Sequence, residues 1–96
     1  MVKIFANQTS LTIKVITYVD LCKVKCAKIR FRKPNGSLGE FLAVLDTFEA
    51  GTLLHHCSGN DLDMAGWWHF WAYIEFEDGR VSIGEAAKLH IWREGI

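Results

Sequence analysis

The side chains with the greatest potential for chemistry are three cysteines and four histidines in a chain of 96 residues. His55 and Cys57 stand two residues apart, which directs both to one face of a strand, whereas His56 points to the other. Zinc binds thiolate and imidazole but needs about four ligands. Cys22 and Cys26, four residues apart, are the candidates to complete the set. Buried or half-buried thiols are the simpler interpretation, and we predict no metal and no other cofactor.

Motifs for catalysis are missing from the chain. It has no Gly-x-Ser-x-Gly elbow, no phosphate-binding loop and no His-Glu-x-x-His pair. Cys57 beside His55 and His56 has the composition of a nucleophile and base, but a flat strand face has neither the pocket nor the oxyanion donors that acyl transfer needs. Asp61 and Asp63 supply fewer oxygens than the about six that calcium requires, so we expect them to cap turns. We predict that the protein is not an enzyme.

The densest aromatic run covers residues 67–76, and its composition favours a strand over a helix. Alternation divides the run into two rows on opposite faces. The wholly apolar row is assigned to the core and consists of Trp68, Phe70, Ala72, Ile74 and Phe76. The other row contains polar side chains, is assigned to the outside, and consists of Trp67, His69, Trp71, Tyr73 and Glu75.

An outward row with two Trp and one Tyr predicts a contact surface. Rings two residues apart on a strand are separated by about 7 Å, and a contiguous exposed apolar patch usually marks an interface. We predict that Trp67, His69, Trp71 and Tyr73 form a docking surface for another protein. Two alternatives stay open: a loop or the N-terminal segment of the same chain covers the rings, or the rings stack on carbohydrate.

Composition limits the class of protein. A hydrophobic content of 50% is enough for one core, so residues 1–96 are predicted to form a single domain. Eleven basic residues balance eleven acidic ones, which leaves no long-range attraction to nucleic acid or to an anionic membrane. The N-terminus lacks the apolar stretch of a signal peptide, and no apolar run approaches the ~20 residues of a membrane span. We therefore predict no nucleic-acid partner and no membrane partner.

Short segments of strand-like pattern are separated by turn signals along the whole chain. The segments expected to form strands are residues 11–15, 27–32, 38–45, 52–57, 67–76 and 81–92, the last with a bulge or break at Gly84. Pro34-Asn35-Gly36 and Asp78-Gly79 carry the chemistry of hairpin turns. About seven short antiparallel strands imply two packed sheets, because a single sheet would leave one apolar face in water. We predict an all-β fold, an immunoglobulin-like β-sandwich, with a small barrel as the competing architecture.

The segment 61–68 is similar to the corner that precedes the sixth strand of immunoglobulin-like domains. That corner has an Asp, then small residues, then an aromatic residue that anchors the crossing between the sheets, and Trp68 takes the place of that aromatic residue here. The paired cysteines and central Trp of antibody domains are missing, so the likeness is to the architecture.

Several elements, in chain order, resemble small immunoglobulin-like modules of tailed-phage and prophage structural proteins, similar in style to the N-terminal domain of baseplate upper proteins. The elements are Val19-Asp20-Leu21, residues 29–36, residues 60–68, Glu77-Asp78-Gly79-Arg80 and Leu89-His90-Ile91-Trp92. That pattern often has Gln at the position of Trp71, so the outer face of this chain is more apolar than that of the modules it resembles.

The resemblance implies a non-enzymatic virion structural protein, assembled in the host cytoplasm. It would be a capsid decoration protein, or an adaptor in a tail, baseplate or fibre. Its expected partners are other virion structural proteins, and an oligomer is expected. No catalytic residues carry over from such modules. The alternative function is a carbohydrate-binding module for a host surface.

Overall fold

The computed structural model describes residues 3–17, 20–46 and 50–95, and this part of the chain forms nine β-strands. The strands are β1 (Ile4–Phe5), β2 (Thr12–Ile16), β3 (Val24–Arg32), β4 (Leu38–Leu42), β5 (Val44–Leu45), β6 (Thr52–His56), β7 (Gly66–Phe76), β8 (Val81–Ile83) and β9 (Ala87–Trp92). None of the described residues forms a helix, so among them no helical segment is long and apolar enough to cross a membrane. Val19, one of the residues that carry the phage resemblance, lies outside the described residues.

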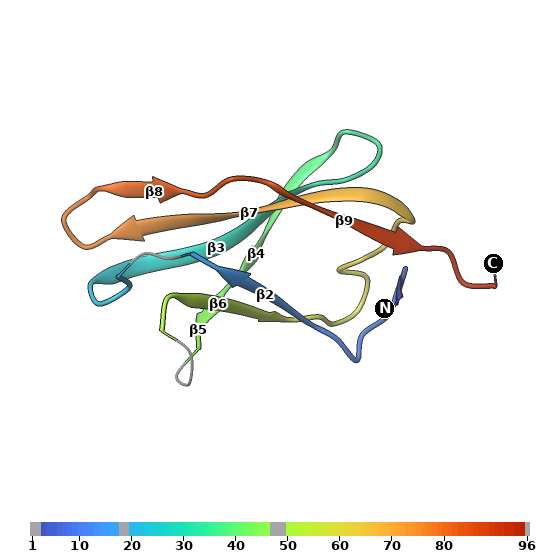
Figure 1. The fold of residues 1–96 in the computed structure, drawn as a ribbon, viewed down its shortest axis with the longest axis horizontal. Helices are drawn as coiled ribbons and strands as arrows, with labels where there is room; N and C mark the ends of the chain where they lie inside the picture. The colour runs from blue at the N-terminus through green and yellow to red at the C-terminus, as the bar shows by residue number, and fades with distance from the viewer. Residues whose placement is uncertain (1–2, 18–19, 47–49, 96) are drawn as a thin grey trace.

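The strands form two sheets that pack as two layers (Figure 1). Sheet A has the order β1-β9-β7-β3-β4, with β8 also paired to β7, and sheet B has the order β2-β6-β5. The neighbours are antiparallel except β1 and β9, which are parallel. Both sheets follow the immunoglobulin strand plan. In that plan one sheet contains β3, β7 and β9, and the other contains β2, β6 and β5. The all-β, immunoglobulin-like β-sandwich predicted from the sequence is thus confirmed.

The core lies between the sheets and is built from the inward row of β7 and its partners. Trp68, Phe70, Ala72 and Ile74 are all buried, as strand alternation predicts. Trp68 has no exposed surface, and its indole Nε1 donates a hydrogen bond of 2.8 Å to the carbonyl oxygen of Met64. This bond ties the start of β7 to the preceding loop, which is the anchoring role expected of the aromatic residue at this corner.

Two hairpin turns adopt the geometry that their sequences predict. Gly36, between β3 and β4, has a φ of 88°, and its N–H donates to the Lys33 carbonyl at 2.9 Å. Gly79, between β7 and β8, also has a φ of 88°, and its N–H donates to the Phe76 carbonyl at 3.0 Å. Glycine adopts positive φ without a steric penalty, so both turns close readily.

The chain changes sheets at Ala43. The sequence pattern predicts one strand over residues 38–45, and the structure instead has β4 in sheet A and β5 in sheet B. In Figure 1 this segment runs diagonally from one layer to the other. The N–H of Ala43 still donates to the carbonyl of Ala27 in β3, at 3.1 Å. The crossing brings Phe41 of β4 against His55 of β6, with the two rings stacked at a centroid distance of 4.2 Å.

Candidate functional site

The row predicted to point outward does project from β7 on the side away from the core. Trp67 is 51% exposed, and His69, Trp71 and Tyr73 are half-buried. We call this side of the sheet the outer face of sheet A. It comprises the outward residues of β3, β4, β7, β8 and β9. The assignment of the two rows of β7 to interior and exterior is therefore confirmed, and the docking role of the outward row stays a prediction.

Cationic side chains from neighbouring strands partly cover the aromatic rings. The guanidinium carbon of Arg30 lies 3.7 Å from the centroid of the Tyr73 ring, and the Lys88 amine lies 4.8 Å from that of Trp67. Such cation–π contacts contribute about 0.5–1 kcal/mol at exposed sites. The outer face is accordingly a mixed layer of rings and cations, and not the bare apolar patch that the sequence predicts.

The aromatic surface continues onto β9, which the sequence analysis missed. His90 packs edge-on against Trp67 at 4.8 Å and against Trp92 at 4.5 Å, measured between ring centroids. Lys3 places its amine 4.3 Å from the centroid of Trp92. The alternation of His90 and Trp92 around the buried Ile91 is the signal that identifies them as outward residues.

Exposed aliphatic side chains flank the rings at both edges of this face. Leu42 pairs with Lys28 across β4 and β3, and Ile83 pairs with Tyr73 across β8 and β7, so each lies on the same side as its partner. The described residues include eight exposed large hydrophobic side chains. Five of them belong to the outer face of sheet A: Leu38, Leu42, Trp67, Val81 and Ile83.

The outer face carries more cations than carboxylates. Its cations are Lys28, Arg30, Arg32 and Lys88, joined at its margin by Lys3 over the Trp92 ring, and its carboxylates are Glu40 and Glu75. Lys28 approaches Glu40 at 2.8 Å and Arg30 approaches it at 3.5 Å. The hydrogen bond between Lys28 and Glu40 raises the pKa of Lys28 and lowers the pKa of Glu40. This face is therefore basic. Because the whole chain has no net charge, the rest of the chain carries a net negative charge.

A hollow lies at the end of the aromatic row, beside the turn that follows β3. Its lining includes Trp67, His69, Arg32, Pro34 and Gly66. Pro34 sits close to Gly66, where an added Cβ would come within 2.7 Å of the proline ring. The hollow combines the most exposed ring of the row, Trp67, with the Arg32 cation. It therefore suits a partner that places an apolar group on the ring and a carboxylate beside the cation.

The residues that can hold a metal lie elsewhere, between the end of β6 and the turn after it. His55, Cys57 and Asp61 have ligand atoms within 4.8 Å of one another. The cluster does not include Cys22 or Cys26, so the ligand set considered from the sequence is not the one that the described residues form. Asp61 does cap its turn, as predicted, by accepting the Ser58 N–H at 2.9 Å. Sequence spacing could not reveal that the same carboxylate also reaches His55.

Comparison with protein-family models and with curated proteins found no match. The fold defines the protein as an immunoglobulin-like β-sandwich, here with an aromatic and cationic outer face. Among solved structures, the chain is similar to that of CopC from Methylosinus trichosporium OB3b, with a TM-score of 0.62 and 13% sequence identity. The similarity covers 98% of this chain and 85% of that chain. At this identity the likeness shows the fold alone.

Proposed function

We propose that the protein is a non-enzymatic docking module that binds another protein through the outer face of sheet A. The observation that carries the proposal is the concentration of exposed hydrophobic side chains on that face, around the aromatic row of β7. Interfaces are enriched in Trp, Tyr and Arg, and these residue types meet at its centre.

The partner surface is expected to be acidic. Arg32 and Lys88 flank His69 on the two neighbouring strands, where their charges remain available to a partner. Carboxylates on the partner would pair with these cations and steer its approach, while apolar side chains would contact the exposed leucines and Trp67. The Tyr73 and Trp67 rings are already held by cation–π contacts with Arg30 and Lys88, so docking loses less side-chain entropy at these two positions.

The specific form of this proposal is a virion structural protein of a tailed phage. It rests on the resemblance of the turn and strand elements to phage immunoglobulin-like modules. In this form the partners are capsid or tail proteins, the assembled protein is oligomeric, and its location is the virion.

Copurification tests the proposal. The proteins to be tested are encoded by the genes on either side of the gene for this chain, because phage structural genes cluster by position in the particle. The tagged whole chain is expected to form a stoichiometric complex with a flanking structural protein, measured by sedimentation velocity. The complex should weaken as salt rises, because exposed ion pairs are screened. A chain that stays monomeric with every flanking product would contradict the proposal. Binding on a glycan array that is lost in Trp71→Ala would favour the carbohydrate alternative instead.

A further inference from the structure

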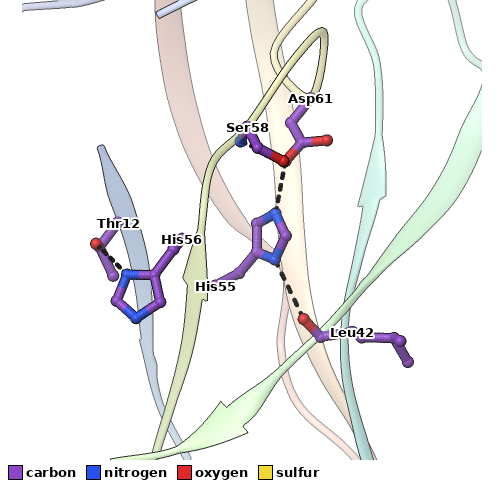
Figure 2. A network of polar contacts seen from close by, with 6 residues as sticks. All are labelled: Thr12, Leu42, His55, His56, Ser58 and Asp61. Carbon is purple, nitrogen blue, oxygen red and sulfur yellow. Dashed lines mark hydrogen bonds and ion pairs between the residues drawn. The ribbon is translucent and has the colours of Figure 1, made fainter. Parts of the chain in front are cut away.

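Both ring nitrogens of His55 face hydrogen-bond acceptors (Figure 2). Nδ1 lies 3.2 Å from the carbonyl oxygen of Leu42, and Nε2 lies 2.8 Å from Oδ2 of Asp61. The ring is held flat against Phe41, with an interplanar angle of 1°. In contrast, the adjacent His56 points to the other side of β6 and bonds Thr12 at 2.8 Å (Figure 2). His55 is therefore fixed in one orientation by three different contacts.

This orientation gives His55 and Asp61 the geometry to hold a cation between them. A carbonyl oxygen can only accept, so in the tautomer that bonds Leu42 the hydrogen is on Nδ1. In the neutral ring the Nε2 lone pair then points at a carboxylate oxygen 2.8 Å away, and two lone pairs at that distance repel. A cation between them removes the repulsion, and either a proton or a metal ion meets this need. A backbone carbonyl that binds Nδ1–H is the usual support for a histidine that binds metal through Nε2.

Cys57 supplies a third ligand beside this pair. It follows His55 by two residues, and its N–H donates to the carbonyl of Leu11 at 2.8 Å, which extends the pairing of β6 with β2. Both side chains therefore lie on the same side of the strand. The ligand atoms of the three residues lie within 4.8 Å of one another. Bonds of about 2.0–2.3 Å to zinc place tetrahedral ligand atoms about 3.3–3.8 Å apart, so only small movements would bring them together.

We propose that His55, Cys57 and Asp61 form a site for a divalent transition-metal ion of the zinc class, which goes beyond the docking function. The thiolate and imidazole donors select this class over calcium or magnesium. Three protein ligands leave the fourth tetrahedral position to water or to a group from a partner. Binding displaces the Cys57 thiol proton and any proton that lies between His55 and Asp61. The sequence alone predicts no metal, because the turn that brings Asp61 to His55 is not visible in it.

The same three residue types also make up a cysteine-nucleophile triad, but the geometry disfavours one. A triad histidine bonds its carboxylate through one nitrogen and the nucleophile through the other. Here the second nitrogen of His55 faces the Leu42 carbonyl. Burial, together with the charge of Asp61, raises the pKa of the Cys57 thiol, whereas a nucleophile needs a lowered pKa. A bound metal ion deprotonates a thiol directly, so the arrangement suits a ligand better than a nucleophile.

Titration with Co²⁺ tests the site in the reduced, metal-free whole chain. The background is the double variant Cys22→Ser and Cys26→Ser, in which Cys57 is the remaining thiol. We expect one Co²⁺ per chain, with thiolate-to-cobalt charge-transfer absorption and the visible bands of four-coordinate cobalt. Cys57→Ser should abolish the charge-transfer band, and His55→Gln and Asp61→Asn should each weaken binding by at least about tenfold. His56→Gln is the matched control and should bind as the background does.

Three results would overturn the site. The first is no saturable Co²⁺ binding in the background protein, and the second is a charge-transfer band that persists in Cys57→Ser. The third is unchanged affinity in both His55→Gln and Asp61→Asn. Because Cys57 is buried, its serine variant must first show a wild-type circular dichroism spectrum. If the serine variant does not fold, the Co²⁺ affinities of His55→Gln and Asp61→Asn decide whether the site exists, because these two ligands are only half-buried.

Discussion

Arg30 and Tyr73 contact each other diagonally across β3 and β7, with the guanidinium carbon 3.7 Å from the ring centroid. In the strand register Arg30 lies opposite Trp71, and Tyr73 lies opposite Lys28. Arg30 also approaches Glu40 on its other side, at 3.5 Å. The guanidinium is thus held between a carboxylate and a ring. The centre of the outer face is therefore ordered before any partner arrives, which lowers the entropic cost of docking.

Removal of the buried indole at position 68 should destabilise the fold strongly. Trp68→Ala leaves a cavity in the core and is expected to lower the free energy of unfolding by about 3–5 kcal/mol. Trp68→Phe keeps most of the apolar volume but loses the hydrogen bond to the Met64 carbonyl, so its loss should be smaller. Chemical denaturation measures both. A Trp68→Ala loss no larger than that of the exposed Trp67→Ala would contradict the assignment of the two rows.

A methyl group at position 39 should not fit beneath Phe31. The Cβ of an alanine there would overlap with Cζ of the buried Phe31 ring, which covers Gly39 of the edge strand β4. Gly39→Ala is expected to cost about 1–3 kcal/mol of unfolding free energy through overpacking. The matched control is Gly84→Ala, whose Cβ would meet its nearest atoms at 3.6 Å. Equal stability of the two variants in denaturant titrations would show that Phe31 moves aside freely.

Much of the fold could be predicted from alternation and turn chemistry. The inward row of β7 follows from its uninterrupted two-residue pattern, and both predicted hairpins follow from glycines at positions that need positive φ. The change of sheets at Ala43 left no such signal. Residues 38–45 continue an extended pattern through it, and only packing decides where a strand leaves its sheet.

Contacts between side chains of different strands were harder to predict. The outward direction of Trp67 and Tyr73 follows from alternation, but the cations that cover them depend on the register of β3 and β9 with β7. Asp61 reaches His55 only because the turn after β6 folds back, and the stack of Phe41 on His55 requires the crossing from β4 to β5. Such contacts join segments whose relative position a single sequence does not specify.

Acid should weaken the protein partly through Asp61. Burial alone would raise the pKa of this carboxyl group, but the hydrogen bonds from the Ser58 N–H and from His55, with the charge of His55, lower it below its ordinary value of 3.8. A lowered pKa in the folded state gives stability that is present above the ordinary value and is lost as the pH falls through the folded pKa. In the presence of a chelator, unfolding midpoints measured from about pH 5 to about pH 2 should fall less steeply in Asp61→Asn than in the wild type. Parallel curves for the two proteins would argue against this contribution.

The three thiols should react with alkylating reagents at different rates. Cys22 is exposed, Cys26 is half-buried and Cys57 is buried. Burial, with the nearby charge of Asp61, raises the pKa of Cys57, and the thiol form reacts slowly. Iodoacetamide labelling followed by mass spectrometry should modify Cys22 first and Cys57 only when the protein unfolds. Labelling of Cys57 as fast as Cys22 in the folded protein would contradict its placement.

The affinity of the Trp67→Ala variant for the partner protein tests the central claim most directly. Trp67 and Val44 have nearly equal exposure, at 51% and 54%, but Val44 lies on β5 of sheet B, so Val44→Ala is the matched control. We predict that Trp67→Ala weakens binding by at least about 2 kcal/mol, roughly thirtyfold, at unchanged folding stability, whereas Val44→Ala binds as the wild type does. Equal affinity of Trp67→Ala and the wild type would contradict a docking role for the outer face of sheet A.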